Sequence, residues 1–260
     1  MPDFIDGHIY DYPQYYDLVF GSDWKTEFNF LRHCFEQHAN RPVQRLFEPA
    51  CGTGRLLIKF AQAGFDVSGN DLNPRAVQYC NNRFQRRGFS SAAVIGDMQD
   101  FQLPRKVDAA FNTINSFRHL MTEQAAEGHL RSVARCLSKG GLYILGLHLI
   151  PNEGNRVEEE SWLARRGNLA VVSMMWSKGL NLRQRREYLG MTFDVYTLTH
   201  HFRILDEMVY RTYTARQMRR LLAKVPELEF AATYDFAYEI DDPITIGPET
   251  EDVVFVLRRR

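Results

Sequence analysis

A glycine-containing turn between an apolar segment and a helical pattern is the part of this chain best suited to hold a ligand. The turn lies in LFEPACGTGRL, residues 46–56, where Glu48 precedes Gly52 and Gly54. Glycines let backbone N–H groups approach a ligand closely, and the helix start that follows favours polar or anionic groups. A second apolar segment, FDVSG, leads to Asp71, at the spacing of about 20 residues at which a carboxylate accepts hydrogen bonds from ribose hydroxyls. The two elements together predict a site for an adenosine-type cofactor.

The spacing of the glycines distinguishes between kinds of nucleotide site. The dinucleotide fingerprint is G-x-G-x-x-G, in which the third glycine permits close packing of helix and strand. Here Leu57 occupies the third position, and no phosphate-binding lysine follows the turn. The pattern therefore argues against both a dinucleotide site and a P-loop.

Strand-like and helix-like segments alternate around this turn. Helical spacing of apolar residues is present over 24–35, 54–63, from 73–74 onward, and over 122–137. Short apolar segments typical of strands cover 44–47, 66–69, 92–95, 107–112 and 142–149. This alternation predicts an α/β fold with a mostly parallel sheet and helices on both faces.

The remainder of the chain has a different pattern. Residues 151–210 alternate apolar and polar positions in three segments that indicate antiparallel strands. A helix is expected over 214–223, and two further strands over 230–238 and 252–258. We therefore expect a core made of residues 1–150 and 211–260, with 151–210 as a small inserted antiparallel sheet that roofs the cleft on the substrate side.

The residues E-P-A-C-G-T-G-R resemble the first motif of class I S-adenosylmethionine-dependent methyltransferases, with Ala50 in place of the first glycine. The resemblance implies a Rossmann-like methyltransferase fold whose seven-stranded sheet ends in an antiparallel strand, for which TEDVVFVLRRR is suited. It also implies S-adenosyl-L-methionine as cofactor. The inserted sheet and YRTYTARQMRRLL are similar to those of small-molecule N-methyltransferases.

The resemblance also assigns roles to individual residues. Asp71 would bind the ribose, and Asp97 and Met98 the adenine. At the end of the fourth strand, Asn112, Thr113 and Asn115 would line the methionine moiety. Tyr16, in YYDLVF, would fold over the cofactor. The expected cofactor-binding residues are Tyr16, Glu48, Ala50, Cys51, Gly52, Gly54, Arg55, Asp71, Leu72, Asp97, Met98, Asn112, Thr113 and Asn115. Each has a structural alternative; Asp71, for example, is also a suitable helix cap.

Methyl transfer from a sulfonium requires chiefly that a nucleophile be held in line and that water be excluded. An amine nucleophile must be neutral, so a nearby base or a lowered amine pKa would assist. His119 and His148 follow the fourth and fifth strands, where open parallel sheets bind ligands, and are the catalytic candidates. Both would otherwise be structural histidines. No metal is expected.

Composition narrows the possible partners. The formal charge is +0, with 32 basic and 32 acidic residues, which disfavours binding to nucleic acid. No apolar run reaches membrane-spanning length, and the first residues lack a signal-like apolar core, so the cytoplasm is the expected compartment. Both a monomer and a homodimer are compatible with the sequence. The function that the sequence favours is transfer of a methyl group to N or O of a small-molecule acceptor. A protein or RNA methyltransferase and a non-catalytic cofactor-binding module remain alternatives.

Overall fold

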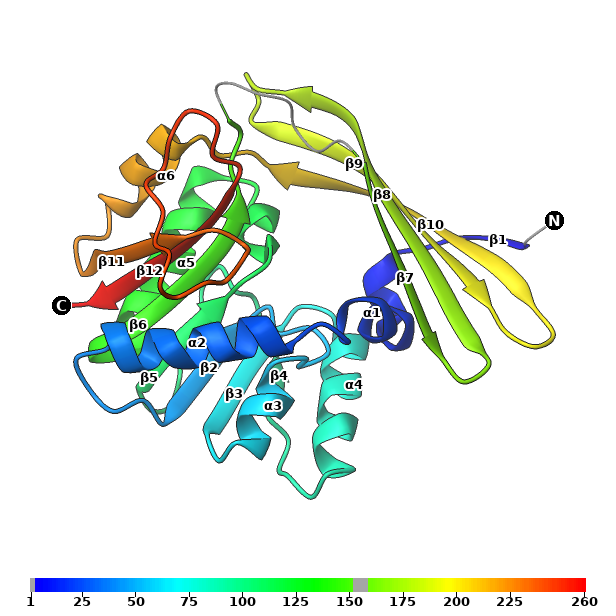
Figure 1. Ribbon diagram of the computed structural model, residues 1–260, viewed down its shortest axis with the longest axis horizontal. Helices are drawn as coiled ribbons and strands as arrows, with labels where there is room; N and C mark the ends of the chain where they lie inside the picture. The colour runs from blue at the N-terminus through cyan, green and yellow to red at the C-terminus, as the bar shows by residue number, and fades with distance from the viewer. Residues whose placement is uncertain (1–2, 152–158) are drawn as a thin grey trace.

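The computed structural model describes residues 3–151 and 159–260, and these form two β-sheets lying side by side (Figure 1). The larger sheet has seven strands in the order β11-β12-β6-β5-β2-β3-β4. Its strands are β2 (Arg45–Pro49), β3 (Asp66–Asp71), β4 (Ala93–Ile95), β5 (Val107–Asn112), β6 (Leu137–His148), β11 (Leu228–Tyr234) and β12 (Asp252–Arg259). All pair in parallel except β12, which runs antiparallel to β6 and β11. This is the Rossmann-like methyltransferase fold that the sequence predicts.

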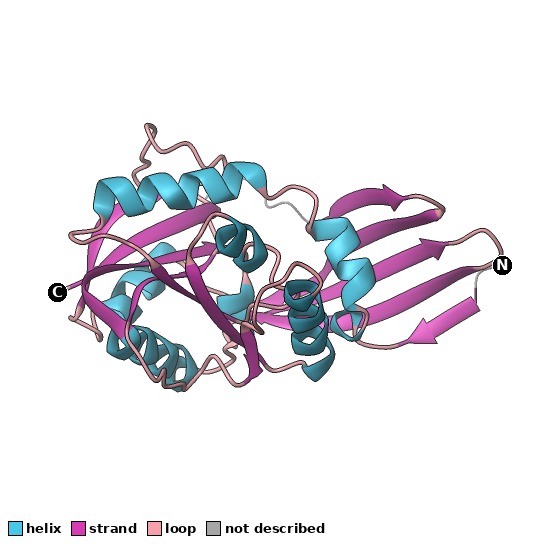
Figure 2. Cartoon of the chain, turned by 90° about the horizontal axis from the view of Figure 1, so that it is seen from below, coloured by secondary structure: helices cyan, strands magenta, loops and turns pink. Residues whose placement is uncertain are grey.

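Helices cover both faces of this sheet, as Figure 2 shows. The helices are α2 (Lys25–His38), α3 (Leu57–Gln62), α4 (Pro74–Gln85), α5 (Glu123–Cys136) and α6 (Ala215–Leu222). Alternate residues of β6 point to opposite faces: Tyr143 and Leu145 pack with α5 and α6, whereas Leu142 and Ile144 pack with α2, α3 and α4. Both faces are buried, which explains the nearly continuous apolar run of this strand.

The start of β6 differs from the sequence prediction. The sequence predicts a helix over 122–137 and a strand only from residue 142, yet the strand already begins at Leu137 and includes Gly140 and Gly141. A Cβ at position 141 would lie 2.5 Å from the Asp108 carbonyl oxygen. The glycine therefore permits a close approach of β6 to β5 rather than ending the helix.

The second sheet has the order β1-β10-β9-β8-β7. Its strands are β1 (Asp3–Asp6), β7 (Glu159–Arg166), β8 (Leu169–Asn181), β9 (Arg186–Tyr196) and β10 (His201–Arg211). The last four are antiparallel, as expected for the inserted segment, although residues 152–158 of that segment lie outside the described residues. The N-terminal β1 pairs in parallel with β10, so the second sheet also takes in the start of the chain.

A short helix, α1 (Pro13–Phe20), packs on this second sheet (Figure 1). Leu18 and Val19 are buried against Val171, Phe193 and Val195. The helix thus lies between the second sheet and the edge of the core, where the glycine turn is found. Within the described residues, no helix is long and apolar enough to span a membrane.

Candidate functional site

The turn after β2 has the backbone conformation that its glycines predict. Gly52 and Gly54 have φ of 52° and 67°, in the left-handed region that favours glycine. A Cβ on Gly54 would lie 2.4 Å from the Sγ of Cys80. Ala50 also has a positive φ, 52°, at the position where the resembling motif has a glycine. This conformation costs an L-residue about 1–2 kcal/mol, so the surrounding contacts hold the turn in a strained form.

The Asp71 carboxylate holds this turn from the end of the neighbouring strand. Its Oδ2 accepts the Gly52 N–H at 2.8 Å, and its Oδ1 accepts the Asn73 N–H at 2.8 Å. The cap of α4 is Asn73, whose side chain accepts the N–H groups of Arg75 and Ala76. Burial raises the pKa of Asp71 above its usual value. The carboxylate therefore fixes the turn and keeps further lone pairs at the ends of β2 and β3.

Asn70 connects the expected site residues in a way that sequence reasoning missed. Its side-chain oxygen accepts the Ala50 N–H at 3.3 Å, and its amide donates to the Asp97 carbonyl at 3.3 Å. Its backbone oxygen accepts the N–H of Cys51. The only available signal was a polar residue at the end of an apolar strand. Asp97 itself is exposed, its Oδ1 accepting the Gln99 N–H at 2.7 Å, while Met98 is buried.

A second group of polar side chains lies at the ends of β2 and β5. The Glu48 Oε2 and the Asn112 Oδ1 are buried and have no hydrogen-bond partner among the described residues. Burial raises the pKa of Glu48 well above its usual value, and Glu27 and Asp71 add to the rise. Such buried acceptors are stabilised when a ligand supplies donors, so these two atoms fit a site for a polar ligand.

Arg55 and Thr113 meet on a residue that the sequence did not suggest. Both contact the carboxylate of Glu27, which is 3% exposed on α2; the Arg55 guanidinium lies 2.5 Å from it and the Thr113 hydroxyl donates to it. Nothing in the local pattern distinguishes Glu27 from a solvent-facing helical glutamate. The remaining expected residue of this region, Leu72, is 64% exposed.

Helix α1 is fixed to the glycine turn by Asp17, which is 3% exposed. Its carboxylate accepts the Thr53 hydroxyl at 3.2 Å, the Tyr79 hydroxyl at 3.3 Å and an Arg83 N–H at 2.6 Å. The neighbouring Tyr16 lies near Asp71 and Arg55, whose charges shift its pKa in opposite directions; burial raises that pKa well above the usual value. The helix thus places Tyr16 near Asp71 and Arg55.

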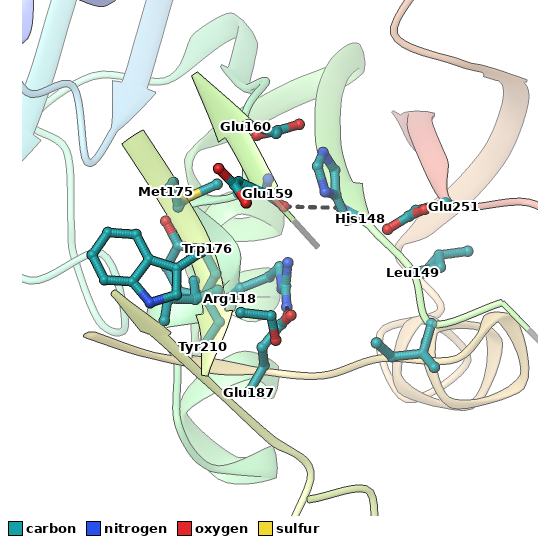
Figure 3. Close-up of a pocket in the computed structure, with 14 residues that line it drawn as sticks. Arg118, His148, Leu149, Glu159, Glu160, Met175, Trp176, Glu187, Tyr210 and Glu251 are labelled. Carbon is teal, nitrogen blue, oxygen red and sulfur yellow. Dashed lines mark hydrogen bonds and ion pairs between the residues drawn. The ribbon is translucent and has the colours of Figure 1, made fainter. Parts of the chain in front are cut away.

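A cavity lies between the two sheets, beyond the end of β6 (Figure 3). Arg118, of the short 3-10 helix η2 (Ser116–His119), forms a 2.5 Å ion pair with Glu187 on β9. The other charged or aromatic lining residues are His148, Glu159, Glu160, Trp176, Tyr210 and Glu251. Burial and the nearby Asp252 and Glu251 raise the pKa of Glu160. The lining is therefore rich in carboxylates.

The two histidine candidates occupy different surroundings. His148 lines this cavity; its backbone N–H donates to Asn115 at 2.9 Å and its Nε2 lies 3.4 Å from Asp252. His119 is not among the described residues that line the cavity. Its ring packs edge-on against Tyr210, which does line the cavity. The Nε2 of His119 lies 3.0 Å from the Tyr10 hydroxyl, and burial lowers its pKa to about 4. His119 is therefore neutral at pH 7 and hydrogen-bonded.

We expect Asp71→Asn to weaken binding of an adenosine-type ligand about tenfold. The amide keeps one acceptor but loses the charge, and a hydrogen bond to a charged group contributes about 1.5–3 kcal/mol. The melting temperature should also fall, because one of the two backbone contacts of Asp71 is weakened. Calorimetric titration with S-adenosylhomocysteine measures the first effect and thermal unfolding the second. Asp66→Asn, on an exposed carboxylate at the opposite end of β3, is the matched control, and an unchanged affinity in Asp71→Asn would contradict the assignment.

Comparison with known proteins adds to this geometry. Residues 47–141 match a family model described as a methyltransferase domain. The chain is 26% identical over 138 residues to a dTDP-3-amino-3,4,6-trideoxy-alpha-D-glucopyranose N,N-dimethyltransferase from Streptomyces venezuelae. The aligned region covers 52% of this chain and 56% of that protein. The aligned region spans about half the length of the curated relatives it matches.

Solved structures resemble the whole chain. A S-adenosylmethionine-dependent methyltransferase from Clostridium acetobutylicum has a TM-score of 0.77 at 16% identity, covering 97% of this chain and 99% of that one. DesVI from Streptomyces venezuelae has a TM-score of 0.77 at 18% identity, covering 96% and 99%. The similarity therefore extends over both sheets and establishes a shared fold.

Proposed function

We propose that this chain, whose core is a class I methyltransferase domain, is a S-adenosylmethionine-dependent methyltransferase that acts on an amine of a small molecule. The observation that carries the proposal is the position of a carboxylate-lined cavity between the two sheets, at the ends of β5 and β6, which lie at the same edge of the parallel sheet as the end of β2 and its glycine turn. The matched relative from Streptomyces venezuelae is itself named as an N,N-dimethyltransferase of an amino sugar.

The cofactor would be held by the strand ends of the core. Asp71 would accept the ribose hydroxyls, and the buried Glu48 Oε2 and Asn112 Oδ1 would take donors from the methionine part. Asp97 and Met98 would enclose the adenine, and Tyr16 would cover the cofactor from α1. These roles follow from the resemblance of the motifs and from the unsatisfied acceptors. When bound, S-adenosylmethionine supplies an electrophilic methyl group on a sulfonium.

The protein side of the reaction is to present a neutral amine and to exclude water. His119, which packs against Tyr210 of the cavity lining, would accept a hydrogen bond from the amine at Nδ1 and so orient its lone pair, because the lowered pKa keeps the imidazole neutral while Nε2 contacts Tyr10. The Tyr10 hydroxyl fixes the ring position through its 3.0 Å contact with Nε2. His148 would line the acceptor site from β6, its main chain fixed by Asn115.

The carboxylates of the cavity favour an acceptor that arrives as an ammonium ion, whose proton would pass to a carboxylate or to solvent before the neutral amine attacks the methyl group. Glu159, Glu160 and Glu251 line it in addition to the Arg118–Glu187 pair, and burial, with the charges of Asp252 and Glu251, raises the pKa of Glu160. An ammonium group would relieve this repulsion, whereas the phosphates of RNA would increase it. The charge of the cavity thus supports an amine acceptor over RNA.

The second sheet would determine which acceptor is bound. Its strands contribute Glu160 from β7, Trp176 from β8 and Glu187 from β9 to the cavity, whereas the glycine turn and Asp71 belong to the core. We therefore propose that residues 151–210, with β1 at the edge of their sheet, form the acceptor wall and that the rest of the chain is the cofactor-binding unit.

The proposal is tested by binding and by transfer. Calorimetry should show binding of S-adenosylhomocysteine but none of NAD. Mass spectrometry should then detect methylation of the amino-sugar nucleotide that the Streptomyces relative is named for, or of another primary amine in a panel, and none of the matched hydroxyl compounds. Absence of S-adenosylhomocysteine binding would refute the cofactor assignment, and transfer confined to RNA or protein would refute the acceptor class.

We expect Glu160→Gln to raise the KM for the amine acceptor about tenfold with little change in kcat. The substitution removes a charged partner of the ammonium, which is worth about 1.5 kcal/mol. Glu249→Gln, an exposed site with the same change in charge, should leave KM unchanged. In the wild type the KM should also rise below about pH 6, because the pKa of Asp252 is raised to about 6 and its protonation removes negative charge. A KM independent of both changes would refute a role for these carboxylates.

A further inference from the structure

A second cavity is lined by arginines from both halves of the molecule. Arg83, Arg86 and Arg87 come from the end of α4, and Arg166 comes from the end of β7 in the second sheet. Of the described residues that line it, Asp17 is the sole acid. The cavity therefore carries four guanidinium groups against one carboxylate.

The single carboxylate is already used by one of the arginines. Asp17 lies 2.6 Å from the Arg83 Nη1 and also accepts the hydroxyl groups of Thr53 and Tyr79. Throughout residues 3–151 and 159–260, Arg86, Arg87 and Arg166 form no ion pair of 4 Å or less. Three cations thus lack a neutralising group.

Nearby groups experience the positive charge of this cluster. The pKa of Lys59 is lowered, first by burial and then by Arg83 and Arg87. The charge of Arg166 also reaches Tyr79 on α4. The pKa of Tyr79 is raised, mainly by burial, and Arg166, on β7 of the second sheet, acts to lower it. Cations at the end of α4 stabilise the helix dipole, which accounts for Arg86 and Arg87 individually. It does not account for Arg166, which approaches the same cavity from β7.

We propose that this cavity binds a phosphate-type oxyanion, with the guanidinium groups of Arg86, Arg87 and Arg166 as its principal ligands. Arginine is suited to this because its planar donors bind phosphate oxygens in pairs. The exposed Asn82 side chain, which also lines the cavity, offers a neutral donor. A bound anion would join α4 of the core to the second sheet.

The site is distinct from the acceptor cavity, and the inference does not depend on the proposed activity. The two cavities share none of their described lining residues. Along β7, Glu160 in one and Arg166 in the other are six residues apart, about 20 Å at the rise of a strand. Arg83 nevertheless contacts Asp17, which holds Thr53 of the glycine turn, so the anion would lie next to the contact that anchors α1.

The test uses the full chain and two probes, inorganic pyrophosphate and thymidine 5′-diphosphate, titrated calorimetrically at constant ionic strength. We expect pyrophosphate to bind the wild type and Arg86→Gln/Arg166→Gln to weaken it at least tenfold. Arg183→Gln, an exposed arginine outside the cavity, should bind as the wild type does. The affinity for S-adenosylhomocysteine should change less than twofold in both variants, which shows that they are folded.

The two probes distinguish a free anion from the phosphate of a larger ligand. Tighter, mutually exclusive binding of thymidine 5′-diphosphate that is lost in the double variant assigns the site to a phosphorylated ligand. Binding of pyrophosphate alone assigns it to a free anion. Failure of both probes to bind, or binding that is equal in the double variant, would overturn the proposal.

Discussion

Arg118→Met should lower the free energy of unfolding by about 3–5 kcal/mol. Arg118 is 4% exposed and pairs at 2.5 Å with Glu187, itself 3% exposed, while its Nε donates to the Arg211 carbonyl. Removing one member of a buried pair leaves the other charge in a medium that solvates it poorly, which is the main source of the loss. Because Arg118 lies on η2 of the core and Glu187 on β9, the loss should loosen the contact between the two sheets. Urea denaturation measures it.

A second variant separates the contribution of the ion pair to stability from that of side-chain packing. Arg118→Met/Glu187→Met replaces both charges by apolar groups of similar volume, and such replacements are often neutral. We expect the double variant to recover most of the stability that the single variant loses. Arg183→Met, at an exposed site, should change stability by less than about 0.5 kcal/mol. A loss under about 1 kcal/mol in Arg118→Met, or no recovery in the double variant, would show that the pair is not a structural connection.

His119→Phe should lower kcat about 100-fold while leaving the affinity for S-adenosylhomocysteine unchanged. The phenyl ring keeps the edge-on packing against Tyr210 but accepts no hydrogen bond, so the amine would lose its orientation. His119→Gln retains an acceptor and should recover part of the rate. Tyr10→Phe removes the 3.0 Å partner but leaves the imidazole, and we expect a smaller loss. Methyl transfer under saturating acceptor measures all three, and equal rates in His119→Phe and wild type would exclude His119 from the reaction.

The pH dependence of stability gives His119 an independent signature. Its pKa is lowered by burial from 6.5 to about 4, so the folded state binds fewer protons than the unfolded state between these values. The resulting stabilisation is fully present above about pH 6.5 and is lost as the pH falls toward 4, by up to about 1.4 kcal/mol for each pH unit. His129, whose pKa is lowered to about 4 by the same cause, contributes in the same direction. His119→Phe should therefore remove part, and only part, of the slope in this range.

Features set by neighbours along the chain were predictable from the sequence. The order of strands and helices in the core followed from apolar periodicity. When one face of a helix or strand is buried, its apolar residues recur with the period of that element. The turn at Gly52 and Gly54 and the position of Asp71 after the next strand also depend on short segments. The resemblance to the methyltransferase fold arises at this level, since the first motif joins the end of a strand to the glycine turn.

Other features depended on the tertiary structure, and they are mostly those that connect distant segments. The strand β1 has four residues, too few for a pattern, and it exists because β10 offers an open edge. Glu27 and Asp17 become part of the site because their helices pack against the glycine turn. Their local sequence does not distinguish them from acids on the solvent-exposed face of a helix. Periodicity predicts whether a side chain is buried or exposed, but it does not predict which residue, distant in the sequence, the side chain contacts. The carboxylate-lined cavity between the sheets and the arginine cluster at α4 and β7 both depend on such contacts between distant segments.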